Sequence, residues 1–102
     1  MSADFDINNL NKVFESRIRL GVMSVLCVND DADFNTLKDL LKVTDGNLAS
    51  HINALEKVNY VQIYKEFVGK KTRTTYKITD EGKNAFQQHL FSLEKMVNAK
   101  AN

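Results

Sequence analysis

The chain has 102 residues, 43% of them apolar, and a formal net charge of only +1. This length predicts one domain, residues 1–102, whose core needs neither a metal nor a disulfide. No apolar run approaches the roughly 18 residues of a membrane span, the first residues are acidic, and the single cysteine excludes an internal disulfide. These features argue against membrane-spanning and disulfide-rich secreted proteins and predict a cytoplasmic one.

The first predicted element is a helix over residues 10–26, where apolar residues recur at helical spacing. Asn8 or Asn9 can cap its start, and the pattern also allows a break near Ser16. Cys27 follows in an apolar run, where a small buried side chain is the favoured interpretation. No base or second cysteine lies near it in the sequence to lower its pKa, which argues against a redox sensor.

Two further helices are predicted next, a short one over residues 36–42 with Asn35 as its cap and a longer one over residues 44–58 started by Thr44. The buried stripe of the longer helix consists of Leu48, Ile52 and Leu55. Its opposite side carries Gly46, Ser50, Asn53 and Lys57, with Asn47 on one flank. A merely solvated helix face usually carries more charges, so these small polar side chains indicate close approach to another surface.

After Asn59 the apolar period changes from helical to two, which predicts a β-hairpin. Its tip is the stretch FVGKKTRTTY, residues 67–76, in which Gly69 can take the positive φ of a tight turn. Residues 65–77 hold five bases against one acid, a local charge of +4, so the remainder of the chain sums to −3. Such cations can reach phosphates or the minor groove of DNA; the alternative is a hairpin that is charged only for solubility.

A last helix is predicted over residues 80–98, with Thr79 as its cap. Its apolar residues continue beyond what a small core needs, which favours a two-fold partner; the alternative is that they fold back onto their own domain. The predicted dimer helices are residues 8–28 and 80–98. The predicted interface residues are Leu10, Val13, Phe14, Phe86, Leu90, Leu93 and Val97.

Catalysis finds little support, because the chain has no nucleophile motif, no phosphate-binding glycine loop and no metal-ligand spacing. We therefore expect neither an enzyme nor a cofactor or metal. His51 lies near the edge of a buried stripe, so a boundary histidine is favoured over a nucleic-acid contact. His89 is expected at an interface or in solvent. An accessory subunit or a metal or redox sensor remains a third, minor hypothesis that rests on Cys27 and these histidines.

Three helices, a hairpin and a fourth helix make the order of the winged helix-turn-helix, a mostly helical α+β fold. The motifs DGNLxxHxxxLE, residues 45–56, and GxxxRTTYxxTxxG, residues 69–82, occur in this order. With them, the chain from Phe14 to Leu93 resembles the winged-helix transcriptional regulators of the MarR/ArsR kind, most closely the short MarR-like proteins.

The resemblance implies that the helix over residues 44–58 enters the major groove and that the wing, residues 67–76, contacts phosphates or the minor groove. The recognition residues implied are Gly46, Asn47, Ser50, His51 and Asn53, and those of the wing are Lys70, Lys71, Thr72 and Arg73. Asn can pair with adenine, whereas Asp45 would be repelled by phosphates and is better suited to a structural role.

The sequence therefore predicts a homodimeric, sequence-specific regulator that binds an inverted repeat in double-stranded DNA, with no membrane partner and an effector that the sequence does not specify. The alternative is a winged-helix module that binds proteins and not DNA. That alternative would need an apolar recognition face, which the helix over residues 44–58 does not offer.

Overall fold

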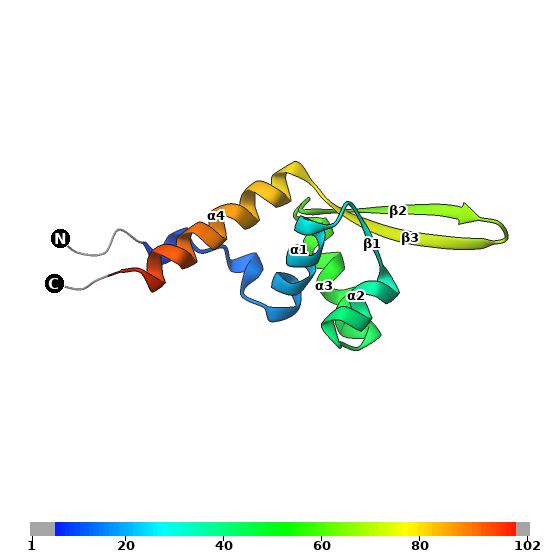
Figure 1. Cartoon of the computed structure of the whole chain (residues 1–102), viewed down its shortest axis with the longest axis horizontal. Coiled ribbons are helices and arrows are strands. Elements are labelled where there is room, and N and C mark those ends of the chain that lie inside the picture. The colour runs from blue at the N-terminus through cyan, green and yellow to red at the C-terminus, as the bar shows by residue number, and fades with distance from the viewer. Residues whose placement is uncertain (1–5, 100–102) are drawn as a thin grey trace.

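The computed structural model of the protein describes residues 6–99, so residues 1–5 and 100–102 of the predicted domain lie outside the description. Four α-helices and a three-stranded antiparallel sheet, in the strand order β1-β3-β2, make up the fold (Figure 1). In chain order the elements are the 3-10 turns Ile7–Asn9 and Lys12–Phe14, α1 (Arg17–Val28), β1 (Ala32–Asp33), α2 (Phe34–Leu41), α3 (Asp45–Lys57), β2 (Val61–Val68), β3 (Lys71–Ile78) and α4 (Asp80–Val97). This is the predicted winged helix architecture.

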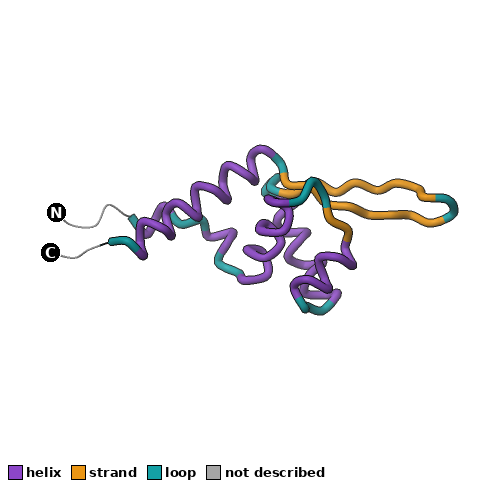
Figure 2. The backbone as a smooth tube through the Cα atoms, in the orientation of Figure 1, coloured by secondary structure: helices purple, strands orange, loops and turns teal. Residues whose placement is uncertain are grey.

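The core lies among the helices and the inner half of the hairpin, where apolar side chains from the α-helices, the strands and the second 3-10 turn meet. Its buried members are Phe14, Val22, Met23, Leu26, Ala32, Leu37, Leu48, Ile52, Leu55, Val61, Tyr76 and Phe86. The hairpin extends well past this core, away from the free end of α4 (Figure 2). We call residues 64–73 the outer wing, because every one of them is exposed.

The predicted single helix over residues 10–26 is wrong in its first half. Residues 10–16 contain the 3-10 turn Lys12–Phe14 instead, and α1 begins only after Ser16, where the pattern allowed a break. Ser16 has extended backbone angles and accepts a hydrogen bond from the Arg19 N–H. The start of the second turn is capped by Asn11, whose side chain accepts from the Val13 N–H. Polar side chains that bond to nearby backbone compete with helix formation, so the apolar spacing alone overestimated the helix.

The second helix begins two residues earlier than predicted, because Asp33 and not Asn35 accepts the Thr36 N–H at 2.8 Å. Asp33 also belongs to the short strand β1, which the sequence did not predict and which pairs with β3 through Asp33 and Thr75. This pairing joins the base of the hairpin to the start of α2.

The N-terminal turns pack against α4 within the same chain. The Phe14 ring lies 5.4 Å from Phe86 and 5.2 Å from His89, centroid to centroid, and Phe14 and Phe86 are only 1% and 3% exposed. The Asn11 N–H donates to Nδ1 of His89 at 3.0 Å, and the Asn11 amide donates to the Tyr60 hydroxyl at 2.9 Å. Two of the predicted dimer residues, Phe14 and Phe86, are thus occupied by their own core.

His89 is 4% exposed, so the expectation that it lies at an interface or in solvent is wrong. Its side chain is an internal hydrogen-bond acceptor for Asn11. Burial lowers the pKa of His89, against a smaller opposing effect of the Glu15 carboxylate.

The hairpin turn is formed by Gly69 and Lys70, with Gly69 at φ +66°, as predicted. The strands pair from Val61 opposite Ile78 out to Val68 opposite Lys71. The connecting turn is therefore shorter than the predicted tip, because Lys71, Thr72 and Arg73 lie in β3.

Candidate nucleic-acid interface

The helix α3 is anchored on one side and exposed on the other. Thr44 caps it by accepting the Asn47 N–H at 3.3 Å, as predicted. The buried residues of α3 are Leu48, Ile52 and Leu55, which are at most 2% exposed. The exposed ones include the candidate contacts Gly46, Asn47, Ser50 and Asn53. The core thus holds one side of α3, and the middle of its exposed side carries small, uncharged residues.

The start of α3 is held against α2 by an ion pair between Lys38 Nζ and Asp45 Oδ1 at 2.8 Å. Asp45 raises the pKa of Lys38 through this hydrogen bond and its charge. The contact gives Asp45 a structural partner, in line with the role expected for it.

His51 lies at the edge of α3 facing α1, where Arg19 donates from Nε to its Nδ1 at 3.0 Å. The same guanidinium donates to the Val13 carbonyl at 3.2 Å and so joins α3 to the N-terminal turns. Because Nδ1 accepts, the proton of the neutral ring is on Nε2. The contact fits the boundary role, and Arg19 is a partner that spacing along the chain could not have suggested.

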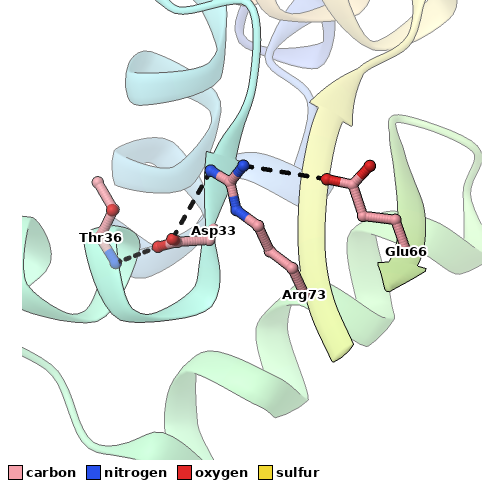
Figure 3. Close-up of polar contacts among 4 residues, drawn as sticks. All are labelled: Asp33, Thr36, Glu66 and Arg73. Carbon is pink, nitrogen blue, oxygen red and sulfur yellow. Dashed lines mark hydrogen bonds and ion pairs between the residues drawn. The ribbon is translucent and has the colours of Figure 1, made fainter. Parts of the chain in front are cut away.

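Arg73 lies between two carboxylates (Figure 3). Its guanidinium is 4.0 Å from Oδ2 of Asp33 and 3.9 Å from Oε1 of Glu66, the residue opposite it on β2. The Thr36 N–H, and to a smaller degree the Arg73 charge, lower the pKa of Asp33. The positive charge of Arg73 is thus partly offset within the protein, and the local charge count did not include Asp33.

The other candidate wing bases are not offset in this way. Among residues 6–99, no carboxylate lies within 4.0 Å of Lys70 or Lys71. Closer to the body, Lys77 Nζ lies 5.1 Å from the centre of the Tyr64 ring, a cation–π contact. The available positive charge therefore lies at the far end of the hairpin.

The tip also carries apolar side chains that the sequence interpretation did not assign. Phe67 is 80% exposed and Val68 57%. Phe67 belongs to the alternating pattern that predicted the hairpin, in register with Val61 and Ile63. Its side chain is exposed because β2 extends beyond the core.

The part of the chain that the structure describes contains neither a cluster of metal ligands nor a membrane-spanning helix. No three His, Cys, Asp or Glu side chains there are grouped to hold a metal ion. Burial raises the pKa of the Cys27 thiol, an effect larger than the opposing one of Lys83. Within the same residues, no helix is long and apolar enough to cross a membrane.

Known proteins share this arrangement. Residues 18–97 match the family model described as a winged helix DNA-binding domain. An uncharacterised protein of Methanocaldococcus jannaschii is 33% identical over 82 residues, which cover 80% of this chain and 89% of that protein. A transcriptional regulator homologue from Pyrococcus horikoshii superimposes with a TM-score of 0.75 at 33% identity, over 90% of this chain and 96% of the other.

A more distant neighbour shares the fold alone. PadR of Bacillus subtilis, solved in complex with operator DNA, has a TM-score of 0.65 at 13% identity, over 72% of this chain and 46% of its own. The match to the family model spans α1 to α4, including the hairpin and the helix that precedes it. The chain therefore belongs to the winged helix DNA-binding domain family.

Proposed function

We propose that the protein is a transcriptional regulator that binds specific sequences in double-stranded DNA as a homodimer. The observation that carries the proposal is the pairing of a small, polar, exposed α3 face with lysines at the hairpin tip that no described carboxylate offsets. The operator complex of PadR supports the same use of this fold.

In this proposal α3 lies in the major groove. Asn47 and Asn53 can pair bidentately with adenine, and Ser50 can donate to or accept from several bases. Gly46 has no atom within 4 Å of an added Cβ, so its backbone is free to approach a DNA strand closely. His51, held by Arg19, would present Nε2–H as a donor at the margin of this surface.

The wing supplies the charge that α3 lacks, and Lys70 and Lys71 are its main phosphate ligands. Each phosphate contact contributes about 0.9 to the slope of log affinity against log salt. Arg73 contributes less than a free arginine would, because Asp33 and Glu66 already face it.

The dimer would use the exposed side of α4. Leu90 and Val97 are 45% and 82% exposed there, and Phe91 lies beside them. Leu10, Val13 and Leu93 are half-buried and can contribute at the margin, whereas Phe14 and Phe86 are inaccessible. A two-fold axis near α4 would place two α3 helices on half-sites about 34 Å apart.

The test is selection of bound duplexes from a random DNA pool, followed by affinity measurements at several salt concentrations. We expect an inverted repeat, a salt slope reduced by about 1.8 in the variant carrying Lys70→Ala and Lys71→Ala, and a loss of about 1 to 3 kcal/mol at particular base pairs for Asn47→Ala. Absence of binding to any duplex at low salt would leave the protein-binding alternative.

The dimer is tested separately by light scattering. Wild type should have the mass of a dimer, and Leu90→Glu should shift the mass towards a monomer, because a charge would be buried at the interface. Lys83→Glu, an exposed change on the same helix, is the control. A wild-type monomer at high micromolar concentration would contradict the dimer without touching DNA binding.

A further inference from the structure

The outer end of the wing exposes two large apolar side chains, Phe67 and Val68. Phe67 and Val68 are adjacent in β2, so their side chains point to opposite faces of the hairpin. Their cross-strand neighbours are Thr72 and Lys71, which are exposed themselves. Nothing in residues 6–99 covers the Phe67 ring, since its 80% exposure is measured with all of them in place.

Cations surround this apolar tip. Lys65 lies on the same face as Phe67, Lys71 is opposite Val68, and Lys70 forms half of the turn. The nearest acid, Glu66, faces Arg73. A second wing of the same charge would be repelled, whereas a groove with apolar sugar walls and anionic rims is complementary to both features.

An undistorted minor groove is too narrow for the tip. The axes of paired strands lie about 4.8 Å apart, so the two strands with their atoms exceed the roughly 6 Å width of the minor groove of B-DNA. Gly69 adds no side chain to the turn. A phenylalanine ring beside the turn would not fit without opening the groove, and apolar wedges that open it unstack a base step and bend the duplex.

We propose that Phe67 is a wedge that the wing inserts into the minor groove, where it partly unstacks a base step while Lys70 and Lys71 hold the phosphates on either side. The inference rests on the proposed DNA binding and names the residue that leads the wing into the groove. It assigns that position to an aromatic ring and not to Arg73, which Asp33 and Glu66 face.

The chain lacks tryptophan, so Phe67→Trp places a single indole reporter at the tip. The probe is the duplex recovered from the selection, and its anisotropy reports binding independently of the indole. On binding, we expect quenched indole emission and protection from acrylamide. Energy transfer between dyes at the duplex ends should show a bend with wild type. The same indole placed by Val28→Trp, at an equally exposed site at the end of α1, should stay accessible.

The second variant removes the wedge. Phe67→Ala should weaken binding about tenfold, comparable with the loss of one base–aromatic contact, and should reduce the bend. Its salt slope should equal that of wild type, because no phosphate contact is lost. Val28→Ala is the matched control and should change neither affinity nor bend.

The outcomes separate the two proposals. If anisotropy shows no binding by wild type, the proposed function fails. If the duplex binds while the indole at position 67 stays as accessible as in the free protein, or if Phe67→Ala bends DNA as wild type does, the wedge is wrong and DNA binding stands. Indole protection that rises with protein concentration without DNA would also overturn it, in favour of contact between copies.

Discussion

The helix α3 and the outer wing, residues 64–73, are built in opposite ways. Three side chains of α3 are buried in the core, its start is capped by Thr44, and Lys38 ties it to α2. The outer wing buries no residue and is held by its own strand pairing, the Gly69 turn and the ion pairs of Arg73.

This contrast predicts that changes in the two regions affect the stability of the fold differently. A change inside α3 alters the core and therefore the whole fold, whereas a change in the outer wing alters a surface that the fold does not depend on. In the proposed DNA complex, base reading by α3 would benefit from a fixed position, and the wing would be free to adjust to the backbone of the duplex.

The largest effect should come from the core side of α3. Leu48→Ala should lower the free energy of unfolding by about 2 to 5 kcal/mol, because it leaves a cavity at a fully buried position. Phe67→Ala should change it by less than about 0.5 kcal/mol. Urea unfolding followed by circular dichroism, at one protein concentration, measures both. Similar losses for the two variants would show that the outer wing is part of the core.

The next largest effects on the free energy of unfolding should come from substitutions at two glycines. An added Cβ at Gly82, in the first turn of α4, would collide with the Tyr60 backbone carbonyl, so Gly82→Ala should cost about 1 to 3 kcal/mol. Gly46→Ala, in α3, meets no atom and should stabilise the fold by about 0.5 to 1 kcal/mol.

The Gly46→Ala variant also separates an effect on the stability of the fold from an effect on DNA binding. Gly46→Ala should weaken DNA binding although it stabilises the fold, because the new methyl group stands on the surface proposed to approach DNA. Unchanged affinity for DNA in this variant would show that the DNA-binding surface does not include the start of α3.

Acidification should weaken the anchored part of the molecule through His89. Its pKa is lowered in the folded state, so the unfolded chain binds more protons between that pKa and the ordinary value of about 6.5. The contribution of neutral His89 to the free energy of unfolding is complete above about pH 6.5. It is lost as the pH falls through the pKa of His89 in the folded protein. Melting temperatures should therefore drop on acidification below pH 6.5, and less so in His89→Gln; equal slopes would contradict the prediction.

The smallest effect should come from Arg73. Its ion pairs are long and half-exposed, so Arg73→Met should cost less than about 1 kcal/mol of stability. In DNA titrations this variant should flatten the salt dependence less than Lys71→Met does, because part of the arginine charge is offset by Asp33 and Glu66. A larger flattening by Arg73→Met would place the arginine directly on phosphate.

Several features set by local chemistry could be predicted from the sequence, although the cap of α2 at Asp33 could not. The caps Thr44 and Thr79 and the turn at Gly69 depend on neighbours in the chain, and the structure confirms them. The buried stripe of α3 is confirmed for the same reason, since helical spacing alone defines it.

Features set by distant partners could not be predicted. The burial of His89 depends on Asn11 and Phe14, and the state of Arg73 depends on Asp33, which pairing of β1 with β3 brings close. The exposure of Phe67 depends on where the core ends, which an alternating pattern does not record.

Asn11 has a consequence for how the chain folds. Two of its hydrogen bonds, to His89 and Tyr60, join positions 78 and 49 residues apart. Contacts of such long sequence separation close large loops, whose entropy must be lost before the contact forms. Docking of the N-terminal turns onto α4 is therefore expected after the helices and the hairpin have assembled. Asn11→Ala, which removes the bond to Tyr60 but keeps the backbone N–H donor to His89, should speed unfolding more than it slows folding.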